Sequence, residues 1–333
     1  TVKLFSLHKL GGFVPITFSG NKHPIVKAFF SEGNQRIFSV ARDGTILLWK
    51  WVQERSQEFN EQVRFAYHKT VKRKKVDDDS DGEVEEQAEN PFLSDFEKNI
   101  MNGRYVLEKK QKIKIEGHHK IIIVEALKVL AVGLSNGTFS IFNLDTFEPI
   151  HSFQISENQI SSLVINSSGE WIAMGSQKLG QLFVWEWKSE SYILKQQGHF
   201  FDVEHVSYSP DGTYIATAGD DGKIKVWNTD SCFCFVTFND HKAAITGLQF
   251  IANKGNAIVS SSKDGTVRAY DLVRYRNFRT FTSPKPVQFT CLASDNADIV
   301  CAGAFDPYDI YMWSIRTGDL IDVLSGHTGP ISC

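Results

Sequence analysis

The stretch GHFFDVEHVSYSPDGTYIATAGDDGKIKVW, residues 198–227, contains one nearly complete structural repeat. It begins with Gly-His and continues with an alternating strand at 203–208 and a Ser-Pro-Asp-Gly turn at 209–212. A short strand at 214–218 and an Asp-Asp-Gly turn lead to a strand that ends on Trp227. With a fourth strand after it, this stretch predicts a four-stranded antiparallel unit.

Copies of this unit recur along the chain at a nearly constant period. From Phe142 onward, the aromatic residues that end successive copies are 43, 42, 43 and 43 residues apart. The full set is Trp49, Phe142, Trp185, Trp227, Tyr270 and Trp313. A period of about 40 to 45 residues with Gly-His and Trp-Asp-like marks is typical of a propeller of four-stranded blades. The sequence therefore predicts an all-β propeller with about six repeats.

Both ends of the chain are expected to cut a blade. Strands at 2–7 and 13–18 would be the outer half of a blade that begins earlier, and residues 327–333 would start another inner strand. The chain is therefore interpreted as a fragment. With this period and these Gly-His and Trp-Asp-like marks, the chain resembles the WD-repeat family over nearly all of its length.

Three copies carry a His, a hydroxyl, an Asp and an aromatic residue. The sets are His23, Ser39, Asp43 and Trp49; His199, Thr217, Asp221 and Trp227; and His241, Ser260, Asp264 and Tyr270. A propeller hydrolase would need one such set in its central channel, whereas these sets repeat from copy to copy. They resemble the buried hydrogen-bond tetrad of WD repeats, so we expect structural roles and no catalytic residue.

Other chemistry finds little support in the sequence. No Gly-rich loop follows a strand and opens a helix, so no cofactor and no small-molecule substrate are expected. His118-His119 has no further ligands nearby, and the five Cys include no C-x-x-C pair, so no metal site is expected. The longest apolar run, 121–134, contains two charges, which argues against a membrane span. We therefore predict a protein that is not an enzyme.

The copy that ends on Trp49 is followed by extra residues. The next copy ends 93 residues later, which predicts an insertion over 53–112 with a disordered, charged linker at 69–91. Its KRKK run at 72–75 is interpreted as nuclear targeting or as a solvated linker, and Ser80 among acidic residues as a phosphosite. Outside 69–89 the chain has 31 basic and 31 acidic groups, so any RNA contact must be local.

Two stretches are more specific than a WD repeat requires. LGQLFVWEWKSESYILKQQGHF (179–200) and DLVRYRNFRTF (271–281) resemble signature stretches of a WD-repeat family of the small-subunit processome. The resemblance implies a scaffold in ribosome biogenesis and rRNA processing, located in the nucleus and nucleolus as part of a ribonucleoprotein. Expected partners are other WD-repeat proteins of the processome through protein-protein interaction, with pre-ribosomal RNA or small nucleolar RNA as a local contact.

The same resemblance implies two propellers in tandem. Residues 1–188 would be the closing blades of the first propeller, and 189–333 the opening blades of the second. The alternative is one closed ring within the fragment, because unpaired strand edges seek partners.

The stretch DLVRYRNFRTF also offers a candidate contact. Arg274, Tyr275, Arg276 and Arg279 present guanidinium forks and a stacking face to RNA or to an acidic partner. The alternative is an edge strand kept soluble by its charges.

The sequence also allows a function other than a scaffold in ribosome biogenesis. The chain could be a substrate receptor of a cullin-based ubiquitin ligase, whose WD families carry W-D-x-R at the end of a blade's third strand. Trp313-Ser314-Ile315-Arg316 matches that mark except for Ser in place of Asp. Another WD-repeat interaction scaffold is equally compatible with the repeats.

Overall fold

The computed structural model consists of β-strands joined by tight turns. The described residues are 1–5, 15–31, 35–53, 103–113, 121–126, 129–178, 180–251, 256–295 and 297–332. Within these ranges there is no helix, and hence none long and apolar enough to cross a membrane. The chain divides into two compact units, Thr1–Ala41 with Thr45–Lys112 and Arg42–Gly44 with Ile113–Cys333.

The smaller unit contains a hairpin and one blade. The hairpin strands are β1 (Val2–Leu4) and β2 (Ile16–Phe18), and the blade strands are β3 (Ile25–Ser31), β4 (Arg36–Ala41), β5 (Thr45–Gln53) and β6 (Gly103–Lys112). The ring centroid of Phe18 lies 5.1 Å from that of Trp49 and 5.5 Å from that of Tyr105, so hairpin and blade share a core. Because β6 pairs with β5, the C-terminal part of the range 53–112 is the fourth strand of the blade.

The larger unit contains five four-stranded antiparallel blades. The first three are β7 (Ile121–Ala126), β8 (Val129–Leu134), β9 (Thr138–Asn143) and β10 (Pro149–Gln154); β11 (Ile160–Ile165), β12 (Trp171–Ser176), β13 (Gln181–Glu186) and β14 (Ser191–Gln197); and β15 (Val203–Tyr208), β16 (Tyr214–Gly219), β17 (Ile224–Asn228) and β18 (Cys234–Phe238). The last two are β19 (Ile245–Phe250), β20 (Ala257–Ser262), β21 (Thr266–Asp271) and β22 (Arg276–Thr282); and β23 (Phe289–Ser294), β24 (Ile299–Ala304), β25 (Ile310–Ser314) and β26 (Leu320–Leu324).

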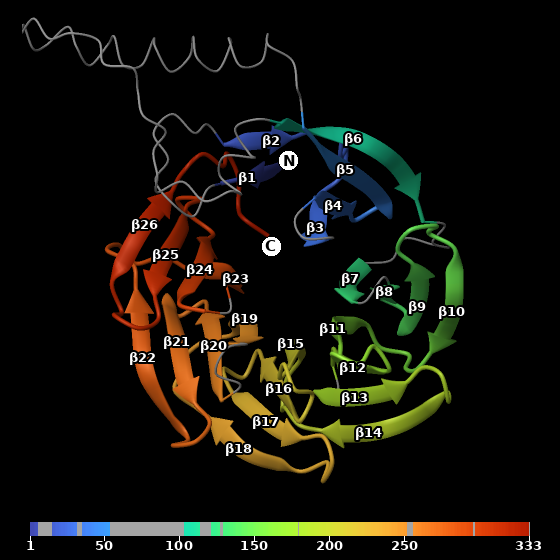
Figure 1. Ribbon diagram of the computed structural model, residues 1–333. Helices are drawn as coiled ribbons and strands as arrows, with labels where there is room; N and C mark the ends of the chain where they lie inside the picture. The colour runs from blue at the N-terminus through green and yellow to red at the C-terminus, as the bar shows by residue number, and fades with distance from the viewer. Residues whose placement is uncertain are drawn as a thin grey trace, which may run out of the picture. The chain divides into compact units, whose positions relative to one another are not determined.

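Within the larger unit, the first strands of successive blades lie side by side (Figure 1). Polar contacts join them: the backbone N–H of Val206 on β15 donates to Ser162 Oγ on β11 at 3.0 Å. The hydroxyl of Ser161 donates to the carbonyl of Val203, and that of Thr290 on β23 donates to the carbonyl of Ile331 at 2.6 Å. The carbonyl of Ile331 therefore accepts a hydrogen bond from the blade β23–β26 in the same way as the carbonyl of Val203 accepts one from the blade β11–β14.

The blades share the same irregularity in their strand pairing. Between the third and fourth strands the register shifts just before the aromatic residue that ends each copy, as at Val184/Trp185, Val226/Trp227 and Ala269/Tyr270. A β-bulge at a fixed place bends the strand and increases its twist. The aromatic residues that set the repeat period thus sit where each blade bends.

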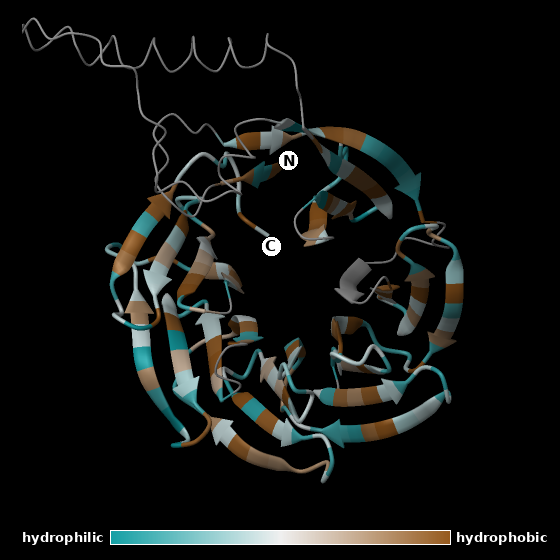
Figure 2. Cartoon of the chain, in the orientation of Figure 1, coloured by the Kyte–Doolittle hydropathy of each residue, from teal (hydrophilic) through white to brown (hydrophobic). Residues whose placement is uncertain are grey.

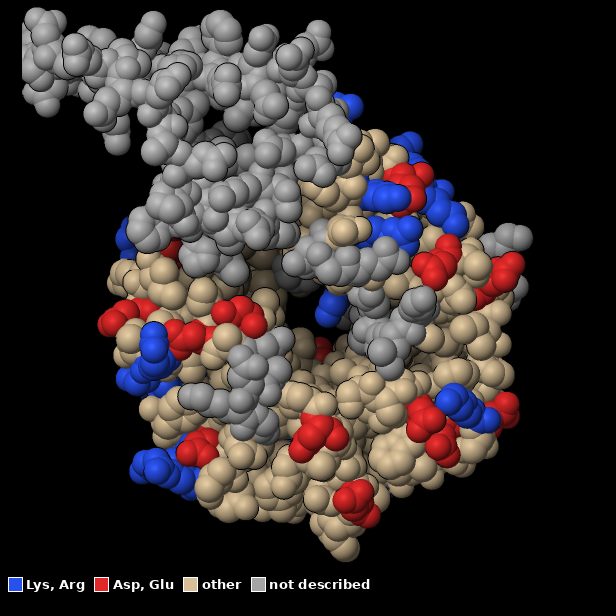
Figure 3. Space-filling model, in the orientation of Figure 1, with Lys and Arg blue, Asp and Glu red and all other residues tan. Residues whose placement is uncertain are grey.

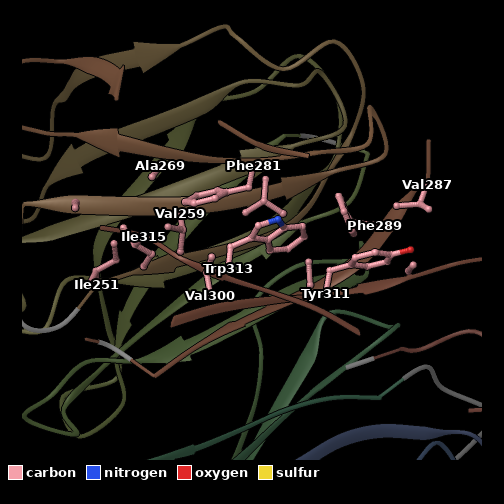
Figure 4. Packing of buried hydrophobic residues seen from close by; sticks show 14 residues of the cluster. Ile251, Val259, Ala269, Phe281, Val287, Phe289, Val300, Tyr311, Trp313 and Ile315 are labelled. Carbon is pink, nitrogen blue, oxygen red and sulfur yellow. The ribbon is translucent and has the colours of Figure 1, made fainter. Parts of the chain in front are cut away.

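The core lies between blades, where aliphatic side chains pack around the aromatic residues. Figure 4 shows Trp313 between Phe281 and Phe289, with ring centroids 6.0 and 5.7 Å away. Phe281 comes from β22 of the preceding blade, so one indole joins two blades. Hydrophobic and hydrophilic bands alternate along β22 in Figure 2, as expected for an outer strand with one buried face.

The four-stranded antiparallel blades confirm the predicted fold, a WD-repeat β-propeller architecture. The expected boundary between residues 188 and 189 falls inside a blade, because β14 pairs with β13 in one sheet. The assignment of blades to two propellers of an intact protein stays a prediction.

Candidate interaction surface and buried hydrogen-bond sets

The structure brings His199, Thr217, Asp221 and Trp227 together in the blade β15–β18. His199 is 3% exposed, and its Nδ1 lies 3.1 Å from Asp221 Oδ1 while its Nε2 lies 2.8 Å from Thr217 Oγ1. The indole N–H of Trp227 donates to the same hydroxyl oxygen at 3.0 Å. The loop before β15 is thereby tied to the turn between β16 and β17 and to the blade interior.

The donor order of this set follows from the indole and the carboxylate. Trp227 can only donate, so the Thr217 oxygen accepts from its indole N–H. The ionised Asp221 carboxylate can only accept, so His199 Nδ1 carries a proton and donates to it, and in the neutral imidazole Nε2 accepts from the Thr217 O–H. Burial raises the pKa of the Asp221 carboxyl, but the hydrogen bonds from His199 and the backbone N–H of Lys223 outweigh it, and the pKa is lowered. Because the hydroxyl is fully buried, this arrangement fixes a loop and presents no nucleophile to a substrate.

A second set occupies the same place in the blade β19–β22. His241 Nδ1 lies 2.9 Å from Asp264 Oδ2, and its Nε2 lies 2.7 Å from Ser260 Oγ. The hydroxyl of Thr266 donates to Asp264 Oδ1 at 2.7 Å. Burial raises the pKa of Asp264, but these hydrogen bonds outweigh it and hold that pKa well below its usual range. Tyr270 is fully buried, with its ring centroid 6.4 Å from that of His241.

In the first blade a further residue reaches the hydroxyl, and the set predicted there with His23 stays a prediction. His23 is exposed, and Asn21 reaches the buried Ser39, donating from Nδ2 to Oγ at 2.8 Å. Asn21 precedes the first strand of its blade by four residues, as His199 and His241 precede theirs. Counting back from the strand would have identified Asn21, because the loop geometry fixes the position and not the residue type. Trp49 is buried in this blade, and Asp43 lies in the chain between β4 and β5.

Two blades retain the tryptophan, buried at Trp313 and partly buried at Trp185, without the hydroxyl. Met174 and Ala302 stand in β12 and β24 where Thr217 stands in β16. Among the described residues, the indole N–H groups of Trp185 and Trp313 have no hydrogen-bond partner. The aromatic residue is therefore kept for its packing even where the polar set is absent.

The predicted contact residues Arg274, Tyr275 and Arg276 lie at the turn between β21 and β22. All three are exposed, and Tyr275 adopts a φ of 50°. The turn is fixed by Asp271, whose Oδ1 accepts the backbone N–H groups of Val273 and Arg274 at 2.8 and 3.2 Å. These bonds lower the Asp271 pKa. Figure 3 shows basic and acidic groups side by side over this turn, at lower left.

Arg279 differs from the other three residues of that prediction. Its Nη2 donates to the carbonyl of Arg316 in the next blade at 2.8 Å, and its side chain lies beside Gly318. Arg279 is half-buried and joins two blades, unlike the exposed Arg274 and Arg276, and its role as a contact residue stays a prediction.

Aromatic neighbours of the turn were missed by sequence reasoning. Phe235 on β18 lies with its ring centroid 6.1 Å from that of Tyr275 and 5.2 Å from that of Tyr214. Phe235 and Tyr275 are 40 residues apart in the chain, which is close to one repeat period. Residues about one period apart lie at similar places in neighbouring blades, so this spacing is the signal that could have predicted the contact.

The remaining candidate sites are those that lie outside the described residues and one acidic cluster. His118-His119, KRKK at 72–75 and Ser80 lie outside the described residues. Asp202, Glu204 and Asp220 place one oxygen each within 4.8 Å of one another, a cluster that the sequence analysis did not anticipate. An acidic cluster of this kind is common on surfaces without a bound ion.

Comparison with known proteins identifies both the repeat and a set of relatives. The family described as "WD domain, G-beta repeat" matches residues 13–50, 190–228 and 232–271. The chain is 36% identical over 365 residues to "Periodic tryptophan protein 2" of Arabidopsis thaliana, which covers 99% of the chain and 39% of the relative. It is 42% identical over 318 residues to the Saccharomyces cerevisiae protein of that name, covering 95% of the chain and 32% of the relative.

A more distant relative carries a functional name. The chain is 32% identical over 150 residues to "Pre-rRNA-processing protein IPI3" of Meyerozyma guilliermondii, covering 41% of the chain and 33% of that protein. The chain spans less than two fifths of the length of each of these three relatives. The repeats and the two long matches agree: the chain is a WD-repeat protein and a homologue of the proteins named periodic tryptophan protein 2.

Proposed function

We propose that the chain is part of a non-catalytic WD-repeat scaffold in ribosome biogenesis, acting in pre-rRNA processing. The observation that carries this proposal is the match of 36–42% identity over at least 95% of the chain to two proteins of one name. The resemblance of residues 179–200 and 271–281 to a family of the small-subunit processome suggests that the chain acts in that assembly. The pre-rRNA-processing name of the third relative supports the same process.

The geometry supports a scaffold over an enzyme. The residues that suggest a hydrolase are buried and hydrogen-bonded to one another in two successive blades. A repeated, closed set stabilises loops, whereas a catalytic set must reach a substrate. The exposed surface of the described blades is then a surface for binding partners. Under this proposal the protein is located in the nucleolus.

The finer parts of the proposal concern assembly. We expect stable association with other WD-repeat proteins of the processome, and contact with RNA, where it occurs, to be local. The ligase alternative has no added support, because Ser314 stands where the W-D-x-R mark has Asp and donates its hydroxyl to Asp298 at 2.8 Å.

The test uses the full-length protein in cells. Depletion should cause the precursor of small-subunit rRNA to accumulate, and the tagged protein should sediment with pre-ribosomal particles in a sucrose gradient. Re-expression of the Asp221→Ala variant at a permissive temperature should restore processing, since no turnover depends on that carboxyl. Association with ligase adaptors and normal rRNA processing after depletion would refute the proposal.

Two propellers in the intact protein are a separate prediction. The resemblance implies a break between Trp187 and His199, whereas β11 and β15, which lie on either side of that point, contact each other. A structure of the intact protein would decide between a tandem arrangement and one ring. Residues 2–7 and 330–333 in one sheet would contradict the tandem arrangement.

A further inference from the structure

The outer rim of two neighbouring blades carries an exposed apolar patch. We define the two-blade patch as Phe233, Phe235, Val273 and Tyr275 with Arg274 and Arg276. The exposed fractions of its apolar members are 73% for Phe233, 66% for Val273, 56% for Tyr275 and 40% for Phe235. The contact between the Phe235 and Tyr275 rings makes the patch continuous from one blade to the next. Contiguous exposed apolar surface of this kind marks interaction sites.

The patch is held rigidly by two equivalent turns. Asn228 Oδ1 accepts the backbone N–H groups of Asp230 and Ser231 at 3.0 and 2.8 Å, as Asp271 Oδ1 accepts those of Val273 and Arg274. Each turn also places a residue four positions later, Cys232 or Tyr275, at positive φ. Because the turns are fixed before binding, the patch itself loses less conformational entropy on association.

The two arginines supply the charge that selects a partner. Within the described part of the chain, neither Arg274 nor Arg276 is in an ion pair, in contrast to Arg279, which bonds to the next blade. The nearby Asp271 carboxylate accepts two backbone N–H groups and attracts both guanidinium groups without forming an ion pair with either. Exposed guanidinium forks beside aromatic rings suit carboxylates bound through two parallel hydrogen bonds.

We propose that the two-blade patch binds a segment of a partner protein in which carboxylates alternate with apolar or aromatic side chains. This proposal rests on the proposed scaffold function and names the partner chemistry of its contact surface. Aromatic residues and Arg are the residues enriched at the centres of protein interfaces. A peptide can place its carboxylates at Arg274 and Arg276 alone, whereas an RNA backbone carries a charge at every nucleotide and meets Asp230 and Asp271 as well.

The experiment locates the partner on the patch in the assembled protein. Tyr275 is replaced by the photo-crosslinker p-benzoylphenylalanine in the full-length protein in cells, and Tyr192, a similarly exposed tyrosine on β14, is replaced in the control. After irradiation, the cross-linked species is digested and sequenced by mass spectrometry. We expect Tyr275, and not Tyr192, to yield one protein segment rich in Asp or Glu with apolar neighbours.

Charge reversal then tests recognition. The Arg274→Glu/Arg276→Glu double variant should lower the cross-link yield at least tenfold, and replacing the acidic residues of the captured segment by Lys should restore it. Lys223→Glu, an exposed change outside the patch, should leave the yield unchanged. A cross-link to RNA, or to a segment without carboxylates, would overturn the proposal.

The outcomes separate this inference from the function on which it rests. Tagged protein that sediments with pre-ribosomal particles but gives no acidic segment at Tyr275 refutes the patch proposal and keeps the scaffold proposal. Protein absent from those particles refutes the scaffold proposal itself. Unchanged melting temperatures of the exposed variants would show that the loss is one of binding.

Discussion

The blades β15–β18 and β23–β26 each bury a tryptophan, but within the described part of the chain only the first gives its indole N–H a hydrogen-bond acceptor. Both bury a tryptophan at the same register, Trp227 opposite Ile215 and Trp313 opposite Val300. The first indole donates to Thr217, whereas the second has Ala302 in place of that hydroxyl and no partner among the described residues. Both blades are nevertheless complete four-stranded sheets. Apolar packing of the aromatic residue thus defines the blade, and the polar set adds to its stability and fixes its loop.

The largest effect is expected where the polar set is complete. Asp221→Ala removes the acceptor of His199 and of the turn N–H of Lys223. Each buried polar group left without a partner costs about 1–3 kcal/mol, so the free energy of unfolding should fall by that amount or more. Chemical denaturation measures the change. The neighbouring, exposed Asp220→Ala is the control, and equal effects of the two changes would contradict the role of the set.

Acid should weaken the two complete sets before it affects the packing. The pKa values of Asp221 and Asp264 are lowered in the folded protein, so the stability from these carboxylates is present above the ordinary Asp pKa of about 3.9. It is lost as the pH falls through the lower folded-state values. Melting temperatures followed downward from about pH 5 should therefore drop below about pH 4.

The variant Asp264→Asn sharpens the acid prediction. Asparagine keeps an acceptor oxygen but does not titrate, so the difference in melting temperature between wild type and variant should shrink as the pH falls. A constant difference would show that this carboxylate does not contribute to the pH dependence.

The first blade offers a smaller test of the same idea. Asn21→Ala removes the bond to the buried Ser39 and should cost about 1 kcal/mol, whereas Lys22→Ala, at the neighbouring exposed position, should stay within about 0.5 kcal/mol. Thermal melts of the two variants give the comparison. Equal effects of the two changes would contradict a stabilising role of the bond between Asn21 and Ser39.

The first blade shows what could be predicted from the sequence and what could not. The period of 42–43 residues and the turn signals predict the blades, because the spacing of strands and aromatic residues is a local property. The contents of a loop are decided by geometry in three dimensions, so the bond from Asn21 to Ser39 in the first blade could not be predicted from the repeat pattern. Arg279 was predicted among contact residues because its neighbours are Arg and Tyr, but only the position of the next blade shows that its guanidinium is occupied.

Arg274 and Arg279 provide the next comparison, between an open and an occupied arginine. Arg279→Ala removes the bond to the Arg316 carbonyl and the packing on Gly318, and should lower the free energy of unfolding by about 1 kcal/mol. Arg274→Ala should change it by less than about 0.5 kcal/mol. Denaturant midpoints measured side by side test this. Equal losses would show that Arg279 does not act as a link between blades.

The smallest effect is a gain. Ala302→Ser places a hydroxyl in β24 at the position that Thr217 has in β16, because each pairs with the residue two positions before the tryptophan of its blade. The Trp313 N–H then has an acceptor, and a neutral hydrogen bond to a buried donor contributes about 0.5–1.5 kcal/mol. Part of this gain is offset, because the new hydroxyl must itself be desolvated in a fully packed site. We therefore expect a rise in stability of about 0.5 kcal/mol, measured by denaturation. Ala302→Val, which adds volume without an acceptor, should lower stability through overpacking. If both variants lose stability equally, the indole N–H gains nothing from a hydroxyl, and the difference between the two blades is one of packing alone.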